Sequence, residues 1–96
     1  MEIKILQDER SYNGWITGAV DDTHWFQAKL FDIGSSFGIK GGRVSKLCIC
    51  KGVCFSWVGC IVNYDRGWDI KPKSKSDKDI LKAVVEYLEK YPKVGG

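Results

Sequence analysis

Four cysteines close together are the side chains of this chain best suited to chemistry. Cys48, Cys50, Cys54 and Cys60 follow the spacing C-x-C-x3-C-x5-C. Thiolates bind zinc, but most structural zinc sites use a C-x2-C pair, and the only histidine, His24, is distant in the sequence. We therefore expect reduced thiols that pack in strands, with zinc binding as the alternative. The prediction includes no metal ligand and no cofactor.

Catalytic pairs are not indicated by the remaining polar residues. The sequence places no serine or cysteine beside His24, so a nucleophile and its base are not predicted. Asp65 and Asp69 bracket a short segment that contains Arg66 and a glycine. This pattern is typical of a turn in which aspartate caps backbone amides and Arg66 pairs with a carboxylate, and a paired-carboxylate site is the alternative. We predict a protein that is not an enzyme.

Two basic segments could contact phosphate. Residues 34–43 combine glycines and serines with Lys40 and Arg43, so free backbone amides and positive charge occur together. The segment matches neither a P-loop nor a dinucleotide-binding fingerprint, and a flexible connection is the alternative. Residues 71–75 and Lys78 form a lysine-rich strip, which reads either as a solvated linker or as a phosphate contact.

The spacing of apolar residues predicts the elements that hold these groups. Apolar residues mostly alternate over residues 3–70, as in strands, and recur every three or four positions over residues 76–91, as in a helix. Residues 37–39 indicate a further short strand that glycines interrupt, and Ser76 is the predicted helix N-cap. The predicted strands are residues 2–7, 13–20, 24–31, 43–51, 53–58, 60–64 and 68–70.

This order of elements predicts the fold class. We expect an α+β domain over residues 1–92, in which a twisted antiparallel sheet of five or six strands carries one C-terminal α-helix on one face. Residues 93–96 are expected to form a flexible tail. The formal charge of +3 is modest, and the sequence contains no apolar run long enough for a signal peptide or a membrane span. We therefore expect a cytoplasmic protein.

Alternation assigns the strand residues to two faces. The set predicted to lie beneath the helix is Ile16, Val20, Phe26, Leu30, Leu47 and Ile49. Trp15, Trp25 and Phe31 must then lie on the opposite face, because a shift of one residue in register would exchange the two sets. The alternative is a curled sheet that buries both faces. The predicted ligand-binding residues are Trp15, Trp25, Phe31, Lys40, Arg43, Lys46, Arg66 and Trp68.

Three stretches carry a resemblance to a known group of proteins. They are V-N-Y-D-R-G-W-D-I-K-P at residues 62–72, F-G-I at residues 37–39 and G-R-V-S-K-L at residues 42–47. Over most of the chain, the sequence resembles small single-domain proteins of Gram-positive bacteria and their phages, a group without an assigned activity. The resemblance transfers no functional residue. It implies a protein that acts stoichiometrically, by blocking a host protein or by sequestering a host signalling nucleotide.

These observations lead to one functional prediction and one alternative. We predict a non-enzymatic inhibitor or adaptor of the anti-defence type that binds a host protein or an anionic nucleotide. The alternative is a protein that binds single-stranded nucleic acid through lysines and aromatic rings on the sheet. A homodimer through the open face of the sheet is compatible with both functions.

Overall fold

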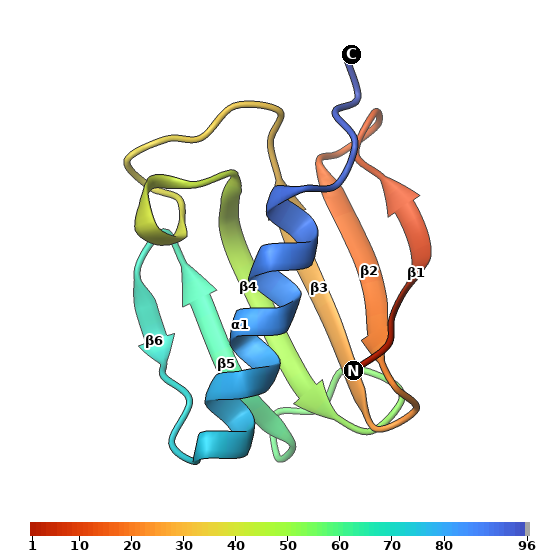
Figure 1. The fold of residues 1–96 in the computed structure, drawn as a ribbon, viewed down its shortest axis with the longest axis vertical. Helices are drawn as coiled ribbons and strands as arrows, with labels where there is room; N and C mark the ends of the chain where they lie inside the picture. Colours follow the sequence, from red (N-terminus) through yellow and green to blue (C-terminus); the bar gives the residue numbers. More distant parts are fainter. Residues whose placement is uncertain (96) are drawn as a thin grey trace.

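A computed structural model describes residues 1–95, which form a six-stranded antiparallel sheet and one α-helix (Figure 1). The predicted α+β class is therefore confirmed. Each strand pairs with the next strand in the chain, so the sheet is a simple meander. The elements are β1 (Ile3–Glu9), β2 (Trp15–Val20), β3 (His24–Leu30), the 3-10 turn η1 (Ile39–Gly41), β4 (Val44–Lys51), β5 (Cys60–Asp65), β6 (Trp68–Ile70) and α1 (Lys75–Glu89).

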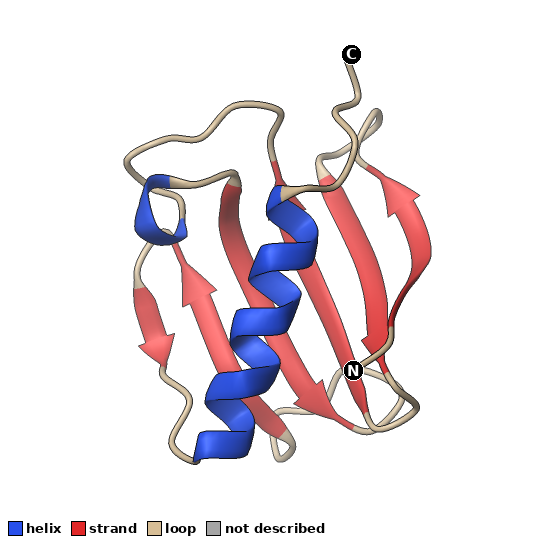
Figure 2. Ribbon diagram, in the orientation of Figure 1, coloured by secondary structure: helices blue, strands red, loops and turns tan. Residues whose placement is uncertain are grey.

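Helix α1 packs across one face of the sheet, over β4 and β5 (Figure 2). It buries Ile80, Val84 and Leu88, which lie on one side of the helix at spacings of four residues. The six residues predicted to lie beneath the helix are all buried, and each is at most 2 % exposed. The side chains between them in the strands point to the opposite face, which we call the outer face.

The pairing of β2 with β3 leaves little space on the helix-covered face. Gly18 lies opposite Phe26 in the register, and the Phe26 ring occupies the space where a side chain at position 18 would project. A Cβ atom at Gly18 would also lie 2.7 Å from the backbone oxygen of Lys4. The glycine therefore allows the large Phe26 ring to be fully buried.

The strand predicted at residues 53–58 is wrong. These residues form the loop between β4 and β5, and Val58 is fully exposed. Gly52 turns the chain with a φ of +103°, and the Lys51 amide donates to the Gly59 carbonyl at 2.8 Å. The hairpin therefore closes before residue 53, and the apolar run that follows projects from the sheet. We call residues 52–59 the β4–β5 loop.

Two further local predictions are corrected. The helix begins two residues early, because the Ser74 hydroxyl rather than that of Ser76 accepts a hydrogen bond from the Asp77 amide, at 3.0 Å. The short strand predicted at residues 37–39 is replaced by a turn that leads into η1. In this segment Lys40 adopts a φ of +53°, which is incompatible with an extended strand.

The predicted tail is attached to the domain over its described part. The amides of Val94 and Gly95 donate to the carboxylate of Asp32 at 2.8 and 2.9 Å. These hydrogen bonds hold the pKa of Asp32 below its usual value. The tail therefore contacts the connection between β3 and β4, and the last residue of the predicted tail, residue 96, lies outside the described residues.

The close contact at Gly18 predicts a loss of stability in the Gly18→Ala variant. The added methyl group must displace the Phe26 ring or the β1 backbone, and overpacking of this kind costs about 1–3 kcal/mol. Urea denaturation of Gly18→Ala and Gly67→Ala measures the effect. A Cβ at Gly67 meets nothing within 4 Å, so the control variant should stay within about 0.5 kcal/mol of the wild type. Equal stability of the two variants would contradict the proposed packing.

Candidate functional site

The outer face carries two pockets that share Lys46. The first, of about 320 Å³, is lined by the cations Lys29, Lys46 and Arg66 and by the rings of Phe31 and Phe37. The second, of about 200 Å³, is lined by residues of β2 to β5 and by one residue of the β4–β5 loop. Together we call these two pockets the basic–aromatic groove.

A row of directly paired residues crosses this groove. Trp15 on β2 lies opposite Lys29 on β3, Lys29 lies opposite Lys46 on β4, and Lys46 lies opposite Asp65 on β5. Two like charges placed directly opposite each other in a sheet repel one another. The row therefore concentrates positive charge at the centre of the outer face, where each lysine needs a compensating partner.

The ends of the row supply part of that compensation. The Lys29 ammonium lies 5.8 Å from the centre of the Trp15 ring, a cation–π distance. The Lys46 ammonium lies 3.5 Å from a carboxylate oxygen of Asp65, and the guanidinium of Arg66 lies 3.7 Å from the same oxygen. Asp65 therefore serves two cations, and both of these ion pairs are partly exposed to water.

Hydrogen bonds position the aromatic and basic walls of the groove. The Tyr64 hydroxyl donates to the Phe37 carbonyl at 2.8 Å, which anchors the loop that carries Phe37. The Phe37 ring remains 57 % exposed. On the other side, Arg66 adopts a φ of +56° and its amide donates to the Ser45 carbonyl at 2.9 Å. This bond ties the β5–β6 turn to β4 and places the guanidinium beside Lys46.

A family model matches residues 14–89 of the chain, and its description is a domain of unknown function, DUF7678. The chain belongs to the DUF7678 family. The matched segment starts immediately before β2 and ends with α1, so it includes every residue of the basic–aromatic groove. Neither the curated proteins nor the solved structures contain a match.

The structure of this DUF7678 domain separates the predicted ligand-binding residues. Trp15, Phe31, Lys46 and Arg66 line the groove. Trp25 also lies on the outer face, where its ring meets Phe55 of the β4–β5 loop with centroids 6.2 Å apart.

Lys40 and Trp68 lie elsewhere. They line a different pocket of about 340 Å³, beside Leu81 and Val85 of α1 on the helix-covered side. The Trp68 ring packs edge-on against Tyr64, with centroids 5.0 Å apart.

Arg43 lies outside the groove, and its contacts give it a structural role. Its side chain donates to the carbonyls of Phe31, Glu89 and Tyr91 at 2.7–2.8 Å, and Arg43 is 8 % exposed. The Glu89 carboxylate in turn accepts from the backbone amides of Arg43 and Val44. Arg43 therefore caps the C-terminal end of α1, where the helix dipole favours positive charge.

Sequence reasoning left several groove residues out of the predicted site, among them Lys29, Phe37 and Phe55. Lys29 gains its importance from facing Lys46, and this register depends on how the long connection between β3 and β4 closes. Phe55 was assigned to a strand, although it belongs to the β4–β5 loop and reaches back over the outer face to line the groove. The signal for Lys29 in the sequence was its place in an alternating strand, on the same predicted face as Trp25.

Three cysteines gather on the outer face next to Trp25. The Sγ atom of Cys48 lies 3.6 Å from that of Cys50 and 3.8 Å from that of Cys60. Burial is the main reason why the pKa of the Cys48 thiol is raised, and burial also raises the pKa of the Cys60 thiol. The fourth cysteine, Cys54, lies exposed on the β4–β5 loop. At neutral pH the thiols of Cys48 and Cys60 are therefore protonated.

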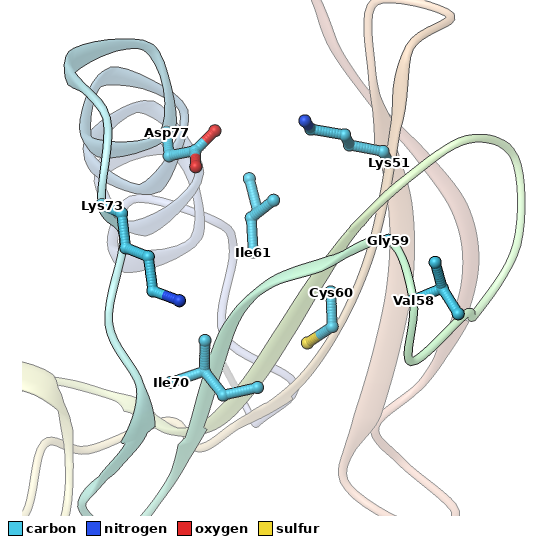
Figure 3. A pocket seen from close by; sticks show the side chains of 8 residues that line it. All are labelled: Lys51, Val58, Gly59, Cys60, Ile61, Ile70, Lys73 and Asp77. Carbon is cyan, nitrogen blue, oxygen red and sulfur yellow. The ribbon is translucent and has the colours of Figure 1, made fainter.

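A small pocket of about 210 Å³ lies between the start of α1 and the start of β5 (Figure 3). Lys51 and Lys73 flank Asp77 there, and Ile61 and Cys60 point to opposite sides of the strand (Figure 3). The charged groups of this pocket are two lysines and one aspartate, which leave a net charge of +1.

His24 does not line this pocket. Its Nδ1 atom lies 2.8 Å from the Thr23 hydroxyl, and burial lowers its pKa. His24 therefore remains neutral at pH 7, at the start of β3.

The cap formed by Arg43 predicts a large stability effect. Arg43→Met keeps much of the aliphatic stem but removes the donors to four carbonyls, including that of Leu88, which should lower the free energy of unfolding by about 2–4 kcal/mol. Arg66→Met is the matched control, because its side chain is 62 % exposed and should change stability by less than about 0.5 kcal/mol. Chemical denaturation followed by circular dichroism measures both values. A wild-type stability for Arg43→Met would rule out this role.

Proposed function

We propose that this DUF7678 domain is a non-enzymatic binding module that holds an anionic nucleotide in the basic–aromatic groove. The observation that carries the proposal is the direct cross-strand pairing of Lys29 with Lys46, beside Arg66. Such a cluster of cations is unfavourable on its own and becomes favourable when a phosphate binds between the charges. A bound anion would take over the role that Asp65 now fills in part.

The groove supports recognition of a base as well as a phosphate. Phe31 and Phe37 expose their rings in the same pocket as the three cations, so a base can stack on them while its phosphate contacts the lysines. The hydroxyl groups of Ser35 and Ser45 also line this pocket and can donate to phosphate or sugar oxygens. The combination of stacking and charge favours a nucleotide over a simple anion.

The proposed action is stoichiometric. The residues that line the groove offer cations, aromatic rings, hydroxyl and amide groups, one ion-paired carboxylate and the Cys48 thiol, whose pKa is raised by burial. This set suits binding better than bond cleavage. The resemblance to small proteins of Gram-positive bacteria and their phages supports the sequestration of a host signalling nucleotide in the cytoplasm. The described residues contain no helix that is long and apolar enough to cross a membrane.

Single-stranded nucleic acid is the second candidate ligand. The second pocket continues from Lys46 toward Trp15 and Phe55, so further bases of a longer strand would meet aromatic surface there. A nucleotide should bind as tightly as an oligonucleotide if the first pocket is the complete site. An affinity that rises with strand length and falls steeply with salt would instead favour nucleic acid.

Calorimetric titration tests the proposal with ATP, cyclic di-AMP and a short oligothymidylate as ligands. We expect one nucleotide to bind per chain, and Lys46→Ala to weaken this binding about tenfold, because a charge-assisted contact is lost. Lys82→Ala is the matched control: it removes the same charge from an exposed position on α1 and should keep wild-type affinity. Chromatography should recover the nucleotide unchanged. Absence of binding, equal loss in both variants or conversion of the nucleotide would each refute the proposal.

Asp65 provides a prediction with the opposite sign. Asp65→Asn removes the carboxylate that pairs with Lys46 and Arg66, so both cations become available to the ligand. We expect nucleotide affinity to rise about threefold at low salt, and the gain to shrink as salt screens the charges. Asp69→Asn is the control, because Asp69 is an exposed residue of β6 outside both groove pockets. Weaker binding by Asp65→Asn would mean that the carboxylate contacts the ligand directly.

A further inference from the structure

Strand pairing gathers thiols that are separated in the sequence. Cys48 and Cys50 project to the same face of β4, because they are two residues apart in a strand. Cys60 opens β5 and pairs with Cys50 across a bulge. The three Sγ atoms all lie within 4.8 Å of one another. This cluster is built from two paired strands, which makes it more rigid than a cluster on a loop.

The separations of the sulfur atoms match those of a metal site. In a tetrahedral thiolate site, bonds of about 2.3 Å from zinc to sulfur place the sulfur atoms about 3.8 Å apart. Two of the three pairs lie at 3.6 and 3.8 Å. An ion could therefore bind all three sulfur atoms after small side-chain rotations, without movement of the strands.

The surroundings of the cluster also suit a metal ion. Cys50 is fully buried, whereas Cys48 and Cys60 are half-buried, so the sulfur atoms are shielded but reachable from the outer face. The β4–β5 loop runs between the two cysteine-bearing strands and packs Phe55 against Trp25, which pairs with Cys50.

We propose that Cys48, Cys50 and Cys60 form a three-thiolate site for a thiophilic closed-shell cation of the Zn²⁺ type. Binding forms three metal–sulfur bonds and releases the thiol protons to solvent, and water completes the coordination. Soft thiolate donors without carboxylates or imidazoles favour such ions over Mg²⁺ or Ca²⁺. This site adjoins the second pocket of the groove, which Cys48 also lines, but metal binding does not depend on the proposed nucleotide binding.

The bound ion would stabilise the wall of the groove. It would join β4 to β5 at the base of the β4–β5 loop, whose Phe55 lines the second pocket. We expect metal binding to raise thermal stability, because the ion would join two paired strands at the base of this loop.

Titration of the reduced full-length chain with Co²⁺, followed by displacement with Zn²⁺, tests this site. We expect one Co²⁺ per chain, with the intense visible bands of tetrahedral cobalt and the ultraviolet charge-transfer absorption of thiolate ligands. Cys48→Ser and Cys60→Ser should each weaken binding at least tenfold. Cys54→Ser is the matched control from the same region and should retain wild-type binding, because Cys54 is exposed on the loop.

A second measurement keeps the test decisive if a serine variant fails to fold. In the wild-type chain, one equivalent of Zn²⁺ should protect Cys48, Cys50 and Cys60 from alkylation, leave Cys54 reactive and raise the melting temperature. Mass spectrometry of the alkylated peptides reads out each cysteine. Octahedral cobalt spectra, equal loss of binding in Cys54→Ser, zinc-independent alkylation or a disulfide within the cluster under reducing conditions would overturn the proposal.

Discussion

Strict alternation along strands that are covered by a helix on one side is the constraint on which the rest of this structure depends. Because α1 buries one face of β4 and β5, alternate residues of the sheet form a compact apolar core. The residues between them must then project to the outer face. Phe26 illustrates the constraint, since its full burial depends on the glycine directly opposite. The same register that buries Phe26 places Lys29 opposite Lys46.

The cations of the chain divide into structural and available groups according to what surrounds them. Arg43 lies at the end of α1 among backbone carbonyls, so its charge completes the helix and links it to β3 and β4. Lys46 and Arg66 share a single carboxylate at the surface, so their charges are incompletely compensated. Proximity in sequence is therefore a poor guide to environment here, because Arg43 and Lys46 are three residues apart and have different partners.

The outer face combines two chemically different surfaces. Its centre carries lysines and aromatic rings, which suit a phosphate and a base. Beside it, the end of β4 and the start of β5 pair and bring three thiols together beneath the β4–β5 loop. Phe55 connects the two, because it packs on Trp25 next to the thiols and also lines the groove. A substitution at one surface should therefore alter the structure of the other surface through this loop.

The sequence by itself determined the fold class, the face of most residues in the long strands and the extent of the helix to within two residues. These features follow from local periodicity, which needs no knowledge of distant contacts. Only the tertiary structure decided which cations meet and where the thiols lie, because strand register depends on how loops close and on bulges such as the one beside Cys50. The apolar run at residues 53–58 shows the limit of periodicity. Its composition suits a strand, but the turn at Gly52 sends it into a loop.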